Sequence, residues 1–272
     1  MTGLTTDTFK RPSDVTDETN PAALYVSSYL LIRTVVGIIG IVLPAFFIIG
    51  EAFYLRGGVH VRGSISAYYH TSMHDIFVAG LCVIGFLLAT YMAGLTKTWD
   101  FWLSFVAGGA VLVVAFFPTR RPSLADDAPL CGTTPMPDGC APIQQVLGEN
   151  LTAVIHFAGA GIFIACLAAI SFLFGRREAK YTHNAAMANF QRLCGWAIVA
   201  ALAWILLGLV VDLTIGEITS LYLGEVVAVW AFGASWLSKG KDLRGILTFG
   251  LLEPRPADKL PAEPPAEPVR EG

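Results

Sequence analysis

Two histidines and an aspartate, His70, His74 and Asp75, lie in the segment 64–75, directly before a long uncharged apolar run. The chain has only five histidines, so a pair four residues apart is its most informative polar feature. On a helix that begins early enough, the two rings share one face. Two imidazoles at this spacing can bind one metal ion, and the segment is therefore the first candidate for a chemical site.

A metal site with an open position for water needs a third protein ligand and a base. His156 is the natural third ligand, and zinc is the metal that suits such a set. Asp75, Asp212 or Glu225 would serve as a fourth ligand or general base. Ser66 lies one helical turn before the histidine pair and would share its face, so we group Ser66, Asp75 and Glu225 as candidate catalytic residues.

Two other interpretations of the histidines remain open. In the first, they only hydrogen-bond helices together and hold Tyr68 and Tyr69 in an interfacial aromatic belt. In the second, a b-type haem is bound between the helices that carry His70 and His156. Bis-histidine electron carriers normally use another pair across the membrane, and this chain lacks it.

Ser66 and His70 also form a Ser-x-x-x-His pattern. This pattern resembles a motif of the membrane hydrolase superfamily that includes alkaline ceramidases and adiponectin-type receptors, where it joins an Asp and a later His-x-x-x-His around zinc. The resemblance covers five residues and is a hint about chemistry only. The chain has no His-x-x-x-His near its carboxyl end and six predicted spans rather than seven, so the zinc set and activity are not carried over.

The elements that must position these residues are predicted to be membrane helices. Hydrophobic residues make up 54% of the chain and charged residues 14%, against roughly 25% charged in an average soluble domain. Stretches near the roughly 20 residues that cross a bilayer occur at about 29–50, 75–95, 101–117, 151–174, 194–213 and 219–238. The sequence therefore predicts an all-α, polytopic membrane bundle of about six transmembrane helices.

The distribution of Lys and Arg predicts the orientation, because cytoplasmic loops retain positive charge. With both termini cytoplasmic, the connections and flanks on the inner side carry most of the basic residues near the spans, including Lys97, Arg176, Arg177 and Lys180. The amino terminus has no pattern of a cleaved signal peptide. We predict a multi-pass protein of the plasma or inner membrane.

The domain organisation follows from composition. We predict a cytoplasmic tail at 1–27, a transmembrane domain at 28–240 with an extracytoplasmic loop at 118–149, and an interfacial segment with a disordered Pro/Glu-rich tail at 241–272. Cys131 and Cys140 lie in that loop, where a disulfide fits an oxidising compartment; two unpaired cysteines are the alternative.

Ionisable residues gather toward the outer halves of the predicted spans, where unpaired charge would be costly unless it lines a wet pocket. We therefore predict an outward-facing pocket, whose candidate substrate contacts are Tyr68, Tyr69, Arg120, Arg121 and Asp212. The two arginines would steer an anionic headgroup, or would simply be solvated loop charges.

Two classes of function follow. The first is a metal-dependent hydrolase of a lipid or lipid-linked substrate. The second is a non-enzymatic protein, either a small-solute or proton-linked carrier or an accessory subunit that binds a membrane protein partner. Expected partners are membrane lipids and a lipid or small-molecule ligand, and no nucleic acid.

Overall fold

The structure is a computed structural model that describes residues 21–55, 61–91, 96–122, 128–211, 213–215 and 218–239. For residues 21–29 and 239 only the backbone is described. Of the tail predicted at 1–27, residues 1–20 lie outside the described residues, and residues 21–27 are helical instead, because the first helix begins at Pro21. The segment predicted at 241–272 and the candidate residue Asp212 also lie outside the described residues. The predictions made for them stay predictions.

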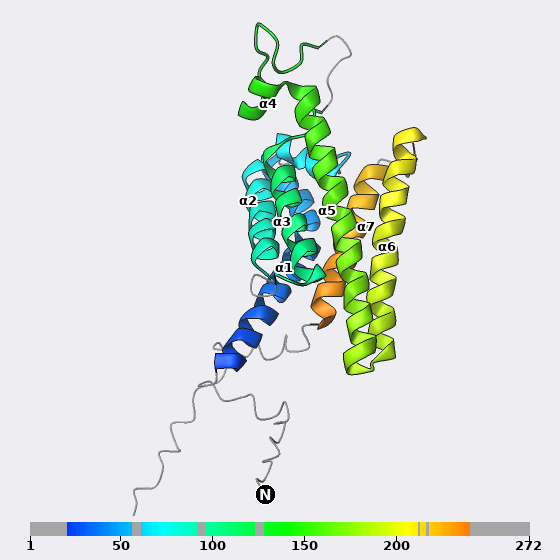
Figure 1. Ribbon diagram of the computed structural model, residues 1–272. Helices are drawn as coiled ribbons and strands as arrows, with labels where there is room; N and C mark the ends of the chain where they lie inside the picture. Colours follow the sequence, from blue (N-terminus) through cyan, green and yellow to red (C-terminus); the bar gives the residue numbers. More distant parts are fainter. Residues whose placement is uncertain are drawn as a thin grey trace, which may run out of the picture. The chain divides into compact units, whose positions relative to one another are not determined.

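Within the described residues, long helices form a ring (Figure 1). Neighbours in the ring are also consecutive in the chain, and the last long helix returns to pack against the first. The members of the ring are α1 (Pro21–Leu55), α2 (His74–Thr90), α3 (Trp99–Phe116), α5 (Glu149–Arg177), α6 (Ala185–Val210) and α7 (Ser220–Lys239). The predicted all-α bundle is confirmed.

Short elements connect these helices. They are a 3₁₀ helix η2 (Ile65–His70), a short helix α4 (Pro142–Leu147), a π-helical turn η3 (Glu178–Thr182) and the strands β1 (Thr214–Ile215) and β2 (Ile218–Thr219). The two strands pair antiparallel, with Thr214 opposite Thr219 and Ile215 opposite Ile218. They form a small hairpin between α6 and α7.

Five of the described helices are long enough and apolar enough to cross a membrane, which indicates a membrane protein. The remaining predicted span, 75–95, corresponds to α2, which is apolar but has 17 residues. Helix α6 begins at Ala185, earlier than the predicted span at 194, because the Asn184 side chain caps it by accepting a hydrogen bond from the Met187 N–H at 3.1 Å. The apolar run alone did not reveal this polar first part of the helix.

One predicted helix is broken in the structure. Ser66, His70 and His74 do not share the face of a single α-helix, because η2 ends at His70 and α2 begins at His74. The Ser64 side chain caps η2 by accepting from the Ala67 N–H at 3.0 Å, and Thr71 has an extended backbone that ends it. A 3₁₀ helix has three residues per turn, so the four-residue spacing no longer brings side chains together.

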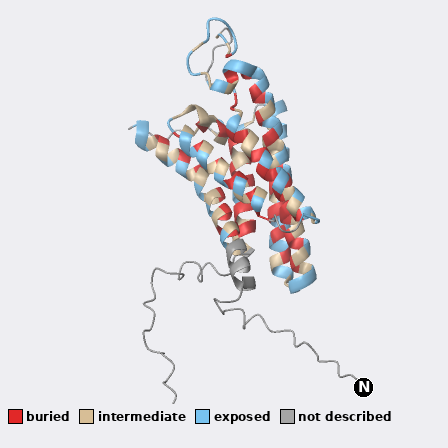
Figure 2. Ribbon diagram, turned by 60° about the vertical axis from the view of Figure 1, so that its left-hand side comes forward, coloured by how far each residue is buried: buried red, intermediate tan, exposed pale blue. Residues whose placement is uncertain are grey.

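Buried residues occur along the long helices of the ring (Figure 2), and the buried core is made of apolar and aromatic side chains. Phe47, Tyr68 and Phe77 form its largest aromatic contact near η2, with the Phe47 ring centroid 5.2 Å from that of Tyr68 and 5.8 Å from that of Phe77. The outside is also apolar: Phe86, Leu193 and Trp196 are each more than half exposed. Such extensive exposed apolar surface agrees with a lipid surrounding.

Helices α2 and α3 approach closely at two glycines. A Cβ atom added at Gly108 would lie 2.6 Å from the carbonyl oxygen of Gly85 and 2.8 Å from the backbone nitrogen of Ala89. Nothing lies within 4 Å of a Cβ added at the neighbouring Gly109. Gly108 therefore permits backbone contact between the two helices, as small residues do in membrane bundles.

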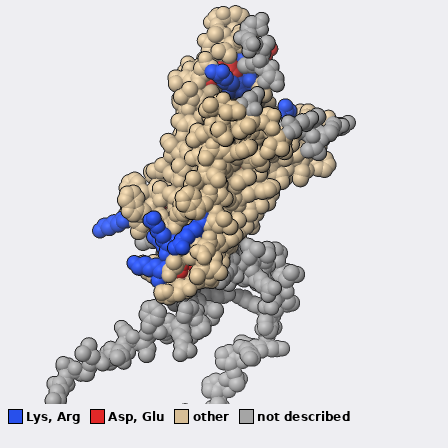
Figure 3. Space-filling model, turned by 90° about the vertical axis from the view of Figure 1, so that its right-hand side faces the viewer, with Lys and Arg blue, Asp and Glu red and all other residues tan. Residues whose placement is uncertain are grey.

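The two ends of the ring differ in charge (Figure 3). The end that carries the turn between α5 and α6 exposes Arg176, Lys180 and Arg192, and we call it the basic end. The other end carries η2 and α4, and we call it the loop end. Here Arg62 donates to the carboxylate of Glu51 through Nε at 2.9 and 3.1 Å. This hydrogen bond raises the pKa of Arg62.

Candidate functional site

A serine and a histidine from distant parts of the chain meet near the loop end of the bundle. Ser66 lies in η2 and His156 lies on α5, and the distance between Ser66 Oγ and His156 Nε2 is 2.8 Å. Both side chains are buried, and that of His156 is fully buried. The contact joins residues 90 positions apart in the sequence.

A backbone carbonyl fixes the orientation of the imidazole. Nδ1 of His156 lies 2.6 Å from the carbonyl oxygen of Phe117, the residue that ends α3. A carbonyl can only accept, so Nδ1 carries the proton. In the neutral ring Nε2 is then an acceptor, and the Ser66 hydroxyl donates to it. A hydroxyl, an imidazole acceptor and a third group that orients the imidazole form the arrangement of an activated nucleophile.

Glu225 on α7 completes this polar cluster. Its Oε2 accepts a hydrogen bond from the Ile65 N–H at 2.5 Å, and its Oε1 lies 3.4 Å from Ser66 Oγ. The carboxyl group therefore holds the first turn of η2 against α7. Glu225 and His156 were both predicted to face the bundle interior near the start of span two, and in the structure Ser66 lies between them.

Ser66 and Glu225 also line a cavity inside the ring. This upper hollow has a cavity volume of about 70 Å³, and its other lining residues are apolar, among them Phe77, Val114 and Ile164. An adjoining lower hollow of about 40 Å³ is lined by apolar residues and glycine. The two hollows share Ile65, Leu81, Phe163 and Val229. The polar cluster thus borders an apolar interior space.

The other two candidate ligands make separate contacts. His70 Nε2 donates to the carbonyl oxygen of Thr119 at 2.9 Å, and burial lowers the pKa of His70. His74 Nδ1 lies 2.9 Å from Asp75 Oδ1. The Asp75 side chain is fully exposed, so the structure does not bring this predicted catalytic residue to Ser66.

The structure does not assemble the predicted zinc ligands. Among the described residues there is no group of three or more His, Cys, Asp or Glu side chains placed to hold a metal ion. Both ring nitrogens of His156 already have hydrogen-bond partners, and Nε2 of His70 has one as well. A metal would have to displace the Ser66 hydroxyl to reach His156 Nε2.

The predicted outward pocket has a counterpart at the loop end. A groove with a volume of about 760 Å³ is lined by Tyr69, His70, His74, Arg121 and the segment around Cys140. The Tyr69 ring packs edge-on against His74, with centroids 4.4 Å apart, and burial raises the pKa of Tyr69. Tyr68 does not line this groove, because its ring is fully buried against Phe47. The structure separates the two tyrosines that were predicted to act together.

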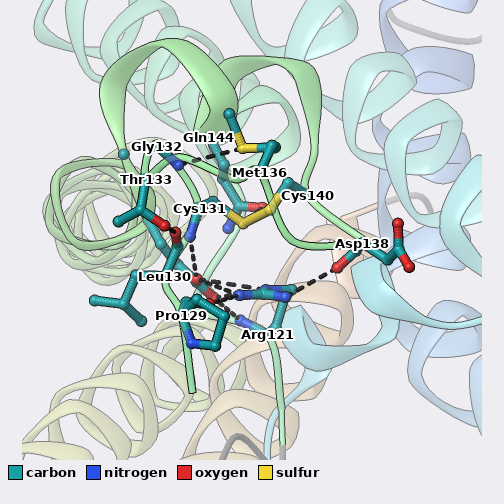
Figure 4. Close-up of polar contacts among 12 residues, drawn as sticks. Arg121, Pro129, Leu130, Cys131, Gly132, Thr133, Met136, Asp138, Cys140 and Gln144 are labelled. Carbon is teal, nitrogen blue, oxygen red and sulfur yellow. Dashed lines mark hydrogen bonds and ion pairs between the residues drawn. A yellow bond between two sulfur atoms is a disulfide. The ribbon is translucent and has the colours of Figure 1, made fainter. Parts of the chain in front are cut away.

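Arg121 has an architectural partner that the sequence did not suggest (Figure 4). Its guanidinium donates to the fully buried carboxylate of Glu149 through Nε at 3.3 Å and Nη2 at 3.1 Å. It also donates to the carbonyl oxygens of Asp138 and Pro129 at 2.9 and 2.8 Å. Arg120, by contrast, is exposed. The guanidinium of Arg121 is thus engaged in folding the loop.

The disulfide between Cys131 and Cys140 is confirmed. Cys131 also donates its backbone N–H to Glu149 Oε2 at 3.1 Å, so the bridge and the ion pair share one carboxylate. Figure 4 shows the disulfide beside the Arg121 side chain.

Sequence reasoning missed the two backbone carbonyls that orient the histidines, those of Phe117 and Thr119. A signal for the first exists, because Phe117 is the C-cap of α3 and the last carbonyls of a helix lack intrahelical partners. Thr119 lies two residues beyond this cap. Comparison of the chain with protein-family models, curated proteins and solved structures gave no significant match.

Proposed function

We propose that this protein is an integral-membrane hydrolase that cleaves an ester or amide bond of a lipid, with Ser66 as nucleophile and His156 as general base. The observation that carries the proposal is the contact between Ser66 Oγ and His156 Nε2 at 2.8 Å, with Nδ1 held by the Phe117 carbonyl. The apolar cavity beside Ser66 supports a lipid as the substrate.

The reaction would follow the general course of serine acyl transfer. Ser66 Oγ attacks the substrate carbonyl carbon while His156 Nε2 takes the hydroxyl proton. The Phe117 carbonyl stabilises the imidazolium that forms, because Nδ1–H donates to it. His156 then gives the proton to the leaving alcohol or amine, and water hydrolyses the acyl-serine with His156 again as base. Glu225 holds η2, and with it Ser66, in position.

This proposal keeps the predicted hydrolase class but replaces metal-bound water by a serine hydroxyl. The metal-dependent form would use His156 Nε2 as a ligand, and that atom accepts the hydrogen bond of Ser66. The geometry therefore favours the serine form.

We also propose that the loop end faces the outside of the cell membrane. Basic residues gather at the opposite end, as cytoplasmic loops require. The disulfide at the loop end fits an oxidising compartment.

A second candidate function rests on the chain of contacts from Glu225 through Ser66 to His156. A hydroxyl between a carboxyl and an imidazole can pass a proton, which favours a proton-linked carrier. Proton flux into vesicles containing wild-type protein that reacts with no hydrolase probe, together with loss of this flux in Ser66→Ala, would support the carrier instead.

The test of the hydrolase is covalent labelling of the purified protein by a fluorophosphonate, which reacts with activated serines. Wild-type protein should be labelled on Ser66, and Ser66→Ala should not be labelled. His156→Gln should lower the labelling rate by about 10²- to 10⁴-fold, the usual contribution of a positioned base. Ser171→Ala is the matched control, because Ser171 is also buried and its hydroxyl donates to the Leu167 carbonyl of its own helix.

Thermal melting in detergent should show that each variant is folded. Labelling that is absent from folded wild-type protein, or unchanged in Ser66→Ala, would overturn the proposal.

A further inference from the structure

We infer that the substrate carries one unbranched apolar chain, which lies along the two adjoining hollows, and that Gly40 limits the length of that chain. The inference rests on the proposed function in one respect: the reactive end of the chain meets Ser66. It goes further by defining the shape of the substrate and the residue that selects it.

The depth of the lining residues gives the direction of the chain. The upper hollow begins at Ser66 and Glu225, and the lower hollow ends among Val36, Leu167 and Phe232. Glu225 and Phe232 are both on α7, and the helical rise places them about 10 Å apart along its axis. The cavity therefore runs from the loop end toward the middle of the bundle.

The chemistry of the walls determines which part of a lipid fits. Ser66 and Glu225 are the polar side chains among the lining residues of both hollows, and both lie at the upper end. A hydroxyl or amide placed deeper would lose its hydrogen bonds to water without gaining a partner, which costs several kcal/mol. The ligand that fits is an unbranched alkyl chain with its carbonyl at the upper end.

Gly40 lies on the wall of the lower hollow, where α1 faces α7. A Cβ added there would lie 3.6 Å from Val229 Cγ1 and 3.7 Å from the Val229 carbonyl oxygen, which are ordinary contacts. Alanine is therefore tolerated. Val229 lines both hollows, so a larger side chain at position 40 would press on Val229 and narrow the passage into the lower hollow. Gly109 is the matched control, because a Cβ there meets nothing within 4 Å.

The first experiment compares hydrolysis of a long-chain and a short-chain p-nitrophenyl ester by purified protein. Gly40→Leu should lower the ratio of kcat/KM for the long ester to that for the short ester by roughly tenfold or more, as expected when a pocket rejects extra methylenes. Gly40→Ala should lower it less, and Gly109→Leu should leave it unchanged. An unchanged ratio in folded Gly40→Leu and Gly40→Ala would overturn the inference.

The second experiment measures binding without turnover. A fatty acid with a photoreactive group near its methyl end is crosslinked to Ser66→Ala protein, and the adducts are mapped by mass spectrometry. Crosslinks should fall on peptides that contain Val36 or Phe232, and should move or weaken in Gly40→Leu. Crosslinks spread over the lipid-facing surface would overturn the inference.

The two proposals can fail separately. Crosslinks in the lower hollow together with wild-type protein that no fluorophosphonate labels would leave the chain site standing and remove the hydrolase. Labelled Ser66 with crosslinks elsewhere would leave the hydrolase standing and remove the chain site.

Discussion

The imidazole of His156 is held from both sides, by the Phe117 carbonyl at Nδ1 and by the Ser66 hydroxyl at Nε2. These two contacts keep the imidazole beside Ser66, which lies in an apolar surrounding, so that the base cannot rotate away from the hydroxyl.

The structure gives Arg121 a different role from the one predicted. Its position in the predicted outer loop suggested a contact with an anionic headgroup, yet its donors are directed to Glu149 and to loop carbonyls.

The pair of Arg121 and Glu149 predicts the effect of a single substitution. Arg121→Ala would leave the fully buried carboxylate of Glu149 without its charged partner, and should lower the free energy of unfolding by about 3–5 kcal/mol. Arg120→Ala changes an exposed neighbour and should stay within about 0.5 kcal/mol of wild type. Chemical denaturation in detergent measures both. Equal stability of the two variants would show that the ion pair contributes little.

At the scale of elements, the break between η2 and α2 decides which residues meet. Because η2 is a separate 3₁₀ helix, Ser66 turns toward α5 and α7, while His74 begins α2 and contacts the exposed Asp75. The close approach of α2 and α3 then places the end of α3 near η2. The carbonyl of its C-cap, Phe117, reaches His156, and that of Thr119, just beyond the cap, reaches His70. The packing of these two helices therefore supports the site.

Gly108 and Gly109 test this packing. Gly108→Ala should destabilise the bundle by about 1–3 kcal/mol, because its Cβ would meet backbone atoms of α2 that cannot move aside. Gly109→Ala should be neutral or slightly stabilising, since the added methyl group is unhindered and alanine favours the helix. Thermal melting in detergent compares them. A Gly108→Ala variant as stable as Gly109→Ala would contradict the close approach.

At the scale of the whole molecule, the charge difference between the ends supports the proposed orientation. Single cysteines at two exposed positions report it: Val146→Cys on α4 at the loop end and Lys180→Cys at the basic end. In intact cells an impermeant thiol reagent should label Val146→Cys, and should label Lys180→Cys only after lysis. The reverse pattern would invert the orientation, and with it the side from which the groove beside His70 and His74 is reached.

The sequence by itself determined the membrane class and the apolar helices, because these depend on local composition. It predicted the disulfide between Cys131 and Cys140 as one of two alternatives, and the structure decided between them. It also named Ser66, His156 and Glu225 as candidate site residues. Only the tertiary structure decided how they combine. The hydrogen bond of Ser66 to His156 spans 90 residues, and the carbonyl partners of His156 and His70 lie at the C-cap of α3 and just beyond it. The predicted zinc ligands came from a spacing that holds only on a continuous α-helix, and the turn at Thr71 interrupts that helix.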